Sequence, residues 1–252
     1  MIFREDGTIQ YTLKRSKRAK HVRLHVTRTK GLEIVVPHSF NKAWLPSILE
    51  KRTDWIRNAA KKLRVPITGE PLERIPNEIF LIALNSTYTV KYVTDERINK
   101  RVIDAQKIIR TATGLLSVEH DGQILLPEAA CEADCIELLR LWLIRSGREY
   151  LPEFLEKVAA QVGIEFKKVQ IRLQKGRWGS CSTRGTISLN ARLLLLPQHL
   201  LQYILLHELA HVRHPNHSQA YWDFLQTLDP NALQHDAEMR DAWQHIPLCF
   251  SM

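Results

Sequence analysis

The sequence has few cysteines, no long apolar run and no apolar leader, and each of these absences bears on the class of protein. Its four cysteines include no C-x-x-C pair, and the spacing of Cys131 and Cys135 fits one helix face, where a buried thiol is expected. No run of 18 apolar residues occurs, so no membrane span is expected. The N-terminal stretch MIFREDGTIQ is polar and lacks the apolar core of a signal peptide. We therefore expect a cytoplasmic protein with reduced thiols.

The composition is that of an ordinary globular protein. Of the 252 residues, 44% are hydrophobic and 25% are charged. These fractions exclude a disordered chain, a collagen and a low-complexity tail. At roughly 150 residues per domain, the length predicts one large domain or two small ones.

Positive charge is concentrated in the first half of the chain. The 36 Lys and Arg residues exceed the 27 Asp and Glu residues, which gives a net charge of +9. Residues 1–130 hold 23 basic and 14 acidic residues, whereas residues 131–252 hold 13 of each. This asymmetry indicates either a polyanionic or acidic partner for the first half or simply a solvated basic surface.

The hydrophobic pattern changes from strand-like to helical along the chain. Residues 10–36 alternate between apolar and polar and predict a β-hairpin, residues 41–64 predict a helix, and residues 79–126 return to strand patterns. Helical patterns dominate from there on. We predict an α+β protein, with a mixed, β-rich N-terminal domain containing one helix at 1–127 and a helix-rich domain with a small sheet at 128–252.

The pattern H-E-x-x-H occurs once, in an apolar segment that is expected to be helical. It comprises His207, Glu208 and His211. On a helix the two histidines lie one turn apart on one face, so that both imidazoles can bind a single metal ion. Glu208 would face the remaining coordination sites, where it can deprotonate a water molecule on the metal.

A catalytic zinc site needs a third protein ligand. The candidates are His214, His217, His235, Glu238 and His245. His214 lies one turn beyond His211 and would extend the same face, which makes it a poor third ligand. His217 follows a turn at Pro215 and can approach the ion from another direction. We therefore favour His217.

The spacing of the three histidines equals that of the metzincins, but two other features differ. The glycine of the metzincin turn is replaced by His214, which precedes a proline and is biased towards extended conformations. No Met-turn follows, because Met239 belongs to a helical pattern. We therefore do not assign the chain to the metzincins.

A second segment of interest precedes the metal-binding helix. It contains R-W-G-S-C-S at 177–182 and I-S-L-N at 187–190, and it predicts a glycine-containing strand, a turn and a second strand. A strand beside a metal cleft can pair with an extended peptide. Cys181 could be a metal ligand or a nucleophile, but without a paired cysteine we favour a packed thiol.

The sequence closely resembles the YgjP-like metallopeptidase family, which is related to the SprT-like zinc proteases. The resemblance is carried by R-W-G-S-C-S, I-S-L-N, Y-I-L-L-H-E-L-A-H and N-H-S-x-x-Y-W. The basic segment K-R-S-K-R-A-K-H-V-R-L and the helix with Trp55-Ile56 also resemble that family. The resemblance covers most of the chain and is most specific over 170–225. It implies a zincin-type catalytic domain with one Zn²⁺ per chain bound by His207, His211 and His217, and with Glu208 as the catalytic residue. It does not identify a substrate.

The basic segment near the N-terminus suggests a second role. From residue 14 to residue 30 there are eight Lys or Arg residues and no acidic residue. The candidate polyanion-binding residues are Lys14, Arg15, Lys17, Arg18, Lys20 and Arg23. They either form a phosphate-binding surface that brings a peptidase to nucleic acid, by analogy with SprT-like proteins, or are a solvated strand face.

Two hypotheses for the function follow. In the first, the protein is a zinc metallopeptidase in which the metal lowers the pKa of a water molecule to about 7 and Glu208 acts as general base, with Tyr221 and Arg177 as candidates for transition-state or substrate contacts. In the second, it is a nucleic-acid-binding protein with a structural or vestigial zinc site. The second gives Glu208 no role, and structural zinc sites normally have four protein ligands.

Overall fold

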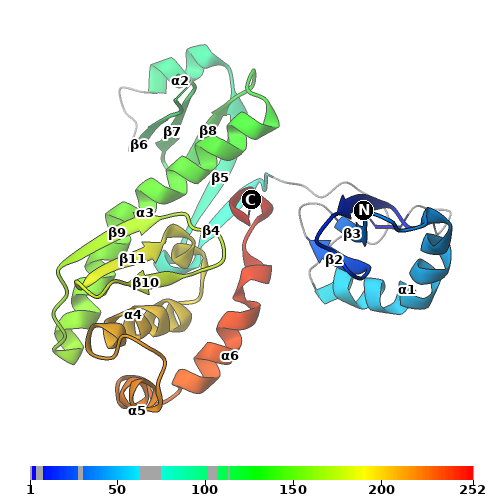
Figure 1. Cartoon of the computed structure of the whole chain (residues 1–252). Helices are drawn as coiled ribbons and strands as arrows, with labels where there is room; N and C mark the ends of the chain where they lie inside the picture. Colours follow the sequence, from blue (N-terminus) through cyan, green and yellow to red (C-terminus); the bar gives the residue numbers. More distant parts are fainter. Residues whose placement is uncertain are drawn as a thin grey trace. The chain divides into compact units, whose positions relative to one another are not determined.

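The computed structural model describes residues 2–3, 8–27, 31–62, 75–101, 107–112 and 114–251. The chain divides into two compact units, Met1–Arg74 and Ile75–Met252 (Figure 1). The boundary that we expected at residue 127 lies inside the second unit. The physical reason is that buried residues before it, such as Ile124, and after it, such as Leu138, belong to one hydrophobic core.

The first unit is a small sheet covered by one helix. Its strands are β1 (Tyr11–Ser16), β2 (Arg23–Thr27) and β3 (Gly31–Pro37), in the order β1-β3-β2. Strands β2 and β3 are antiparallel, which confirms the predicted hairpin, and β1 runs parallel to β3. Helix α1 (Leu45–Lys62) begins after a short 3-10 turn and tolerates Pro46 in its first turn. Apolar residues of β3 and α1 form the core of this unit: Leu32, Ile34, Val36, Leu45, Leu49 and Ile56.

The second unit begins with a five-stranded sheet. Its strands are β4 (Glu78–Leu81), β5 (Ser86–Val93), β6 (Lys107–Arg110), β7 (Leu116–His120) and β8 (Gln123–Pro127), in the order β4-β5-β8-β7-β6. The short helix α2 (Asp95–Arg101) follows β5.

The long helix α3 (Glu132–Val162) links this sheet to the rest of the unit. It continues through Pro152 and ends at Gly163, which adopts the left-handed conformation typical of a helix C-terminus (φ 64°). At Gly147 the helix backbone lies against the next sheet, since a Cβ atom there would be 2.9 Å from Cγ2 of Ile171 and 3.0 Å from Cβ of Ala191. Only glycine allows this close approach.

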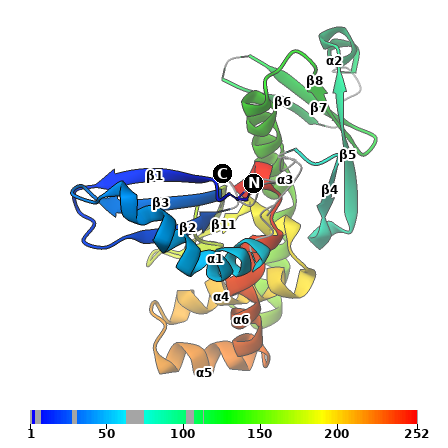
Figure 2. The same cartoon turned by 90° about the vertical axis from the view of Figure 1, so that its right-hand side faces the viewer.

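A three-stranded sheet follows, and four helices complete the unit. The strands are β9 (Lys168–Arg172), β10 (Gly179–Cys181) and β11 (Thr186–Asn190), in the order β10-β11-β9. The helices are α4 (Gln198–Arg213), α5 (Gln219–Leu228), α6 (Ala232–Ala242) and α7 (Leu248–Ser251). Helix α4 packs against β10 on one side and against α5 and α6 on others (Figures 1 and 2). The fold class is therefore α+β, as predicted.

Over the described residues, no helix combines the length and the apolar character that crossing a membrane would require.

Candidate functional site

Three histidine side chains converge at the C-terminal end of α4. The Nε2 atom of His217 lies 3.2 Å from Nε2 of His207 and 3.1 Å from Nε2 of His211. Among the described residues, they form the only group of at least three His, Cys, Asp or Glu side chains whose ligand atoms all lie within 4.8 Å of one another. Three imidazole nitrogens are a ligand set that catalytic zinc sites use.

The turn after α4 brings His217 to this point. Helix α4 ends at Arg213, and His214 adopts an extended conformation (φ −125°, ψ 95°), as expected before Pro215. The His214 side chain packs near the Phe224 ring and does not join the three converging imidazoles. The chain after Pro215 brings His217 back to α4, where its Nε2 atom meets those of His207 and His211.

The backbone fixes the tautomer of His211. Its Nδ1 atom lies 3.0 Å from the carbonyl oxygen of His214. A carbonyl oxygen can only accept, so Nδ1 carries the proton and Nε2 keeps its lone pair for a metal.

Burial keeps His207 neutral. Desolvation, together with the smaller effects of the neighbouring His211 and His217, lowers its pKa to about 3, and the charge of Asp236 acts in the opposite direction. Because only the neutral imidazole binds a metal, His207 is in the binding form at physiological pH.

Glu208 is a buried carboxylate beside the three histidines. The residue is 3% exposed, and its Oε2 atom has no hydrogen-bond partner among the described residues. Burial raises its pKa to about 8, and the positive charge of Arg177 acts in the opposite direction. An unpartnered buried carboxylate oxygen is costly, so its position suits a group that contacts a further molecule, such as a water on the metal.

Gly179 on β10 makes room for this carboxylate. A Cβ atom at Gly179 would lie 2.7 Å from both Cγ and Cδ of Glu208 and closer still to Oε1. The sequence showed Gly179 within R-W-G-S-C-S, but its role depends on the packing of β10 against α4. A glycine inside a predicted strand was the available signal.

Tyr221 supports the metal-binding helix. It is fully buried, its hydroxyl donates to the carbonyl oxygen of His207 (3.3 Å), and its ring stacks on His211 at 4.5 Å. Burial raises the pKa of Tyr221. Because its hydroxyl is directed at the backbone, the structure favours a supporting role over the transition-state contact considered from the sequence.

Arg177 lies on the surface near Glu208. Its side chain is exposed, and its charge acts on the carboxylate. The loop that carries it is held by Asn190, whose Nδ2 atom donates to the carbonyl oxygens of Gln174 (2.9 Å) and Arg177 (2.8 Å). Asn190 is the last residue of I-S-L-N, and the sequence alone does not indicate this role.

Cys181 is half-buried on β10. Burial raises its pKa, and the nearby Glu208 raises it further. A protonated thiol is a poor nucleophile and metal ligand, which favours a packed thiol.

The six basic residues near the N-terminus have different surroundings. Lys14 forms an ion pair with Glu33 (2.5 Å), and Arg15 donates to the carbonyl oxygens of His38 and Phe40. All six are exposed. Three of the other four lie in the connection between β1 and β2 and one lies on β2: Lys17, Arg18, Lys20 and Arg23.

Comparisons with known proteins agree with the chemistry of this site. The family model described as YgjP-like, metallopeptidase domain matches residues 20–242. No curated protein matches the chain. Among solved structures, the chain is similar to the metallopeptidase zymogen abylysin of Pyrococcus abyssi, with 30% identity over 36% of this chain and 93% of that chain. The TM-score is 0.33.

Proposed function

The chain belongs to the YgjP-like metallopeptidase family, and from this membership we propose that it is a zinc-dependent peptidase with one Zn²⁺ held by His207, His211 and His217. The observation that carries the proposal is the convergence of three Nε2 atoms beside the buried, unpartnered carboxylate of Glu208. A structural zinc site would be closed by a fourth protein ligand and would give this carboxylate no role.

The three histidines would hold the metal ion, and Glu208 would handle the proton. When bound, the zinc ion supplies Lewis-acid polarisation of the scissile carbonyl and lowers the pKa of a water molecule. Glu208 accepts the proton of the attacking water at Oε2 and passes it to the nitrogen of the leaving amine. A divalent cation nearby favours the charged carboxylate, so Glu208 would be a base at neutral pH when the metal is present.

We propose that the substrate binds along β10. This strand is at the edge of the three-stranded sheet, pairs with β11 on one side, and packs against α4. An extended peptide could add to its outer edge through backbone hydrogen bonds, which would hold the scissile bond near the histidines.

Glu208→Gln tests the assigned mechanism. We expect the variant to retain about one zinc per chain, because the three imidazoles remain. Turnover of a peptide library should fall by about 10²- to 10⁴-fold, because the general base is lost. Zinc is measured by elemental mass spectrometry and cleavage by mass spectrometry of the products.

A suitable control is Glu153→Gln, which changes an exposed carboxylate of α3 in the same way. If Glu208→Gln cleaved as fast as wild type, the assigned role would be wrong. Bound zinc without proteolysis of any peptide would instead favour the alternative of a nucleic-acid-binding protein with a structural or vestigial site.

A further inference from the structure

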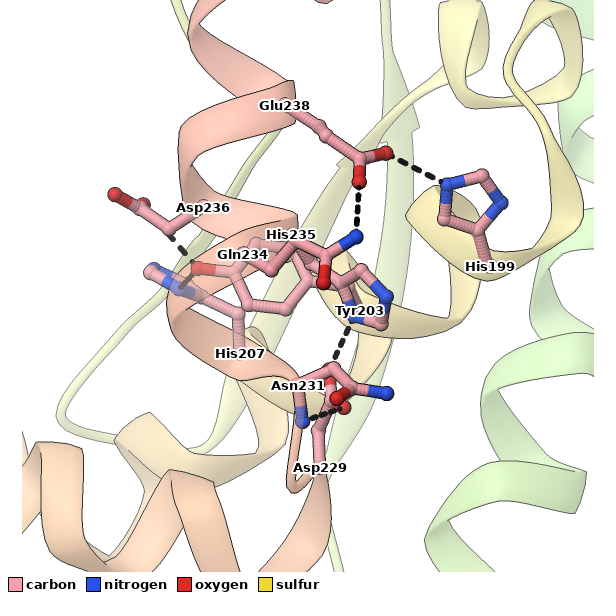
Figure 3. Close-up of polar contacts among 9 residues, drawn as sticks. All are labelled: His199, Tyr203, His207, Asp229, Asn231, Gln234, His235, Asp236 and Glu238. Atoms are coloured by element: carbon pink, nitrogen blue, oxygen red, sulfur yellow. Dashed lines mark hydrogen bonds and ion pairs between the residues drawn. The ribbon is translucent and has the colours of Figure 1, made fainter.

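A stripe of polar side chains on α4 faces α6. His199, Tyr203 and His207 lie one helical turn apart, and two of them contact carboxylates of α6 (Figure 3). His199 Nε2 lies 2.9 Å from Oε2 of Glu238, and the hydroxyl of Tyr203 donates to Oδ1 of Asp236 at 3.2 Å. The third side chain, His207, is one of the converging histidines.

Tyr203 connects Asp236 to His207, because the direction of its hydroxyl proton determines which nitrogen of His207 is protonated. A carboxylate offers only acceptors, so the single hydroxyl proton of Tyr203 is directed to Asp236. The Tyr203 oxygen lies 3.4 Å from Nδ1 of His207 and can then only accept from it. Nδ1 of His207 therefore carries its proton, and Nε2, 3.2 Å from Nε2 of His217, keeps the lone pair.

The surroundings of Tyr203 and Asp236 favour this arrangement of hydrogen-bond donors and acceptors. Tyr203 is 1% exposed, so its hydroxyl depends on protein partners. The second oxygen of Asp236, Oδ2, lies 2.9 Å from Nη2 of Arg240. Arg240 therefore balances the charge of the carboxylate and leaves Oδ1 for Tyr203.

We propose that Tyr203 and Asp236 are positioning residues that hold His207 in the Nδ1–H tautomer, so that α6 sets the zinc affinity of a site built on α4. The proposal rests on the proposed zinc site. Neither residue belongs to the H-E-x-x-H pattern. Partners of this kind typically change metal affinity by about 10- to 100-fold when removed.

The tautomer can be observed without metal or substrate. Long-range ¹H–¹⁵N spectra of the full, metal-free chain distinguish protonated from unprotonated ring nitrogens of neutral histidine. We expect wild-type His207 to carry its proton on Nδ1. In Tyr203→Phe this acceptor is lost, and the proton should move to Nε2. In Asp236→Ala the tyrosine hydroxyl is free to donate to Nδ1, which should also place the imidazole proton on Nε2.

The same variants should bind zinc about 10- to 100-fold more weakly in competition with a chelator. Two matched control variants distinguish an effect on the His207 tautomer from a general disturbance of the packing around α4. Tyr221→Phe removes an equally buried hydroxyl that contacts the backbone of His207, and it should leave the tautomer unchanged. Glu238→Ala removes the neighbouring contact between α4 and α6, and it should change neither the tautomer nor the zinc affinity.

Three results would overturn the proposal: an Nε2–H tautomer in wild type, an unchanged tautomer in Tyr203→Phe, or an equal loss of zinc affinity in Glu238→Ala. Failure of the proposed function is a different result. It would appear as a wild-type chain that binds no zinc, whatever the tautomer of His207.

Discussion

Glu208 is an acid held away from water in the metal-free protein, and this predicts a specific dependence of stability on pH. Its pKa of about 8 lies above the ordinary value of 4.5, so the folded state holds a proton that the unfolded state releases between these values. The corresponding stabilisation is complete below pH 4.5 and is lost as the pH rises through 8.

Glu208→Gln is neutral at every pH and provides the reference. In the presence of a chelator, the free energy of unfolding of the variant relative to wild type should rise between pH 4.5 and pH 8. Urea titrations of both proteins at these two pH values, followed by a signal from the second unit, measure the difference. A difference independent of pH would contradict the raised pKa.

Gly179 determines where the carboxylate of Glu208 lies. In Gly179→Ala, the new Cβ atom would overlap Cγ and Cδ of Glu208, so the carboxylate must move away from the site. A displacement of about 1 Å can reduce catalysis by about 100-fold. We expect kcat to fall by this order while the zinc content stays at the wild-type level. Ser180→Ala, at the next position of β10, is the control and should retain activity; a fully active Gly179→Ala would show that the close packing is unimportant.

Sequence patterns predicted some of these residues and not others. His207, Glu208, His211 and His217 belong to one short stretch of chain, where helical spacing and one turn determine which side chains can meet. Gly179 acts through the contact of β10 with α4, and Asp236 through the contact of α6 with α4. Such contacts join segments that are distant in the sequence. Local periodicity does not show which of these segments meet, so the glycine in β10 could be noticed but not assigned a partner.

At the scale of elements, α3 and β9 pack at the distance that Gly147 allows. Gly147→Val would place side-chain atoms where Ile171 and Ala191 already lie. Overpacking of this kind typically lowers the free energy of unfolding by about 1–3 kcal/mol. A urea titration followed by a signal from the second unit measures this decrease in the free energy of unfolding. The control Gln161→Val puts the same β-branched residue on an exposed part of α3. An equal loss there would show that close packing at Gly147 is not the cause.

Local periodicity predicted individual helices and strands better than it predicted which of them pack into one unit. The alternation around Leu24 and Val26 predicted the hairpin, and β2 and β3 confirm it. The change from strand to helix patterns at residue 127 is equally real, since β8 ends there and α3 begins soon after. The pattern could not reveal that this sheet and the following helices bury the same core. For that reason the structural division lies earlier, between residues 74 and 75.

At the scale of the whole molecule, the positive charge remains to be explained, and we propose that the first unit binds a polyanion. Lys17, Arg18 and Lys20 are exposed together in the connection between β1 and β2. The full chain should bind double-stranded DNA or RNA with an affinity that falls linearly with the logarithm of salt concentration. Changing all three to glutamate should weaken binding and reduce this slope, because phosphate contacts are lost. Fluorescence anisotropy over a series of salt concentrations measures both quantities.

The control makes the same charge change in the second unit, at Lys157, Lys168 and Arg172, which are also exposed. Equal weakening by both sets would show that net charge alone is responsible. Binding that is unaffected by the first set would exclude this surface as the polyanion site.

The two units have separate cores, and this affects what a denaturation experiment can report. The buried apolar residues of the first unit form one cluster and those around the metal site form another, without a shared member among the described residues. Two such cores need not lose their structure in one cooperative step, so a single melting temperature would not define the stability of this chain. Tryptophan offers a way to separate them, because Trp44 and Trp55 lie in the first unit while Trp142 and Trp178 are buried in the second.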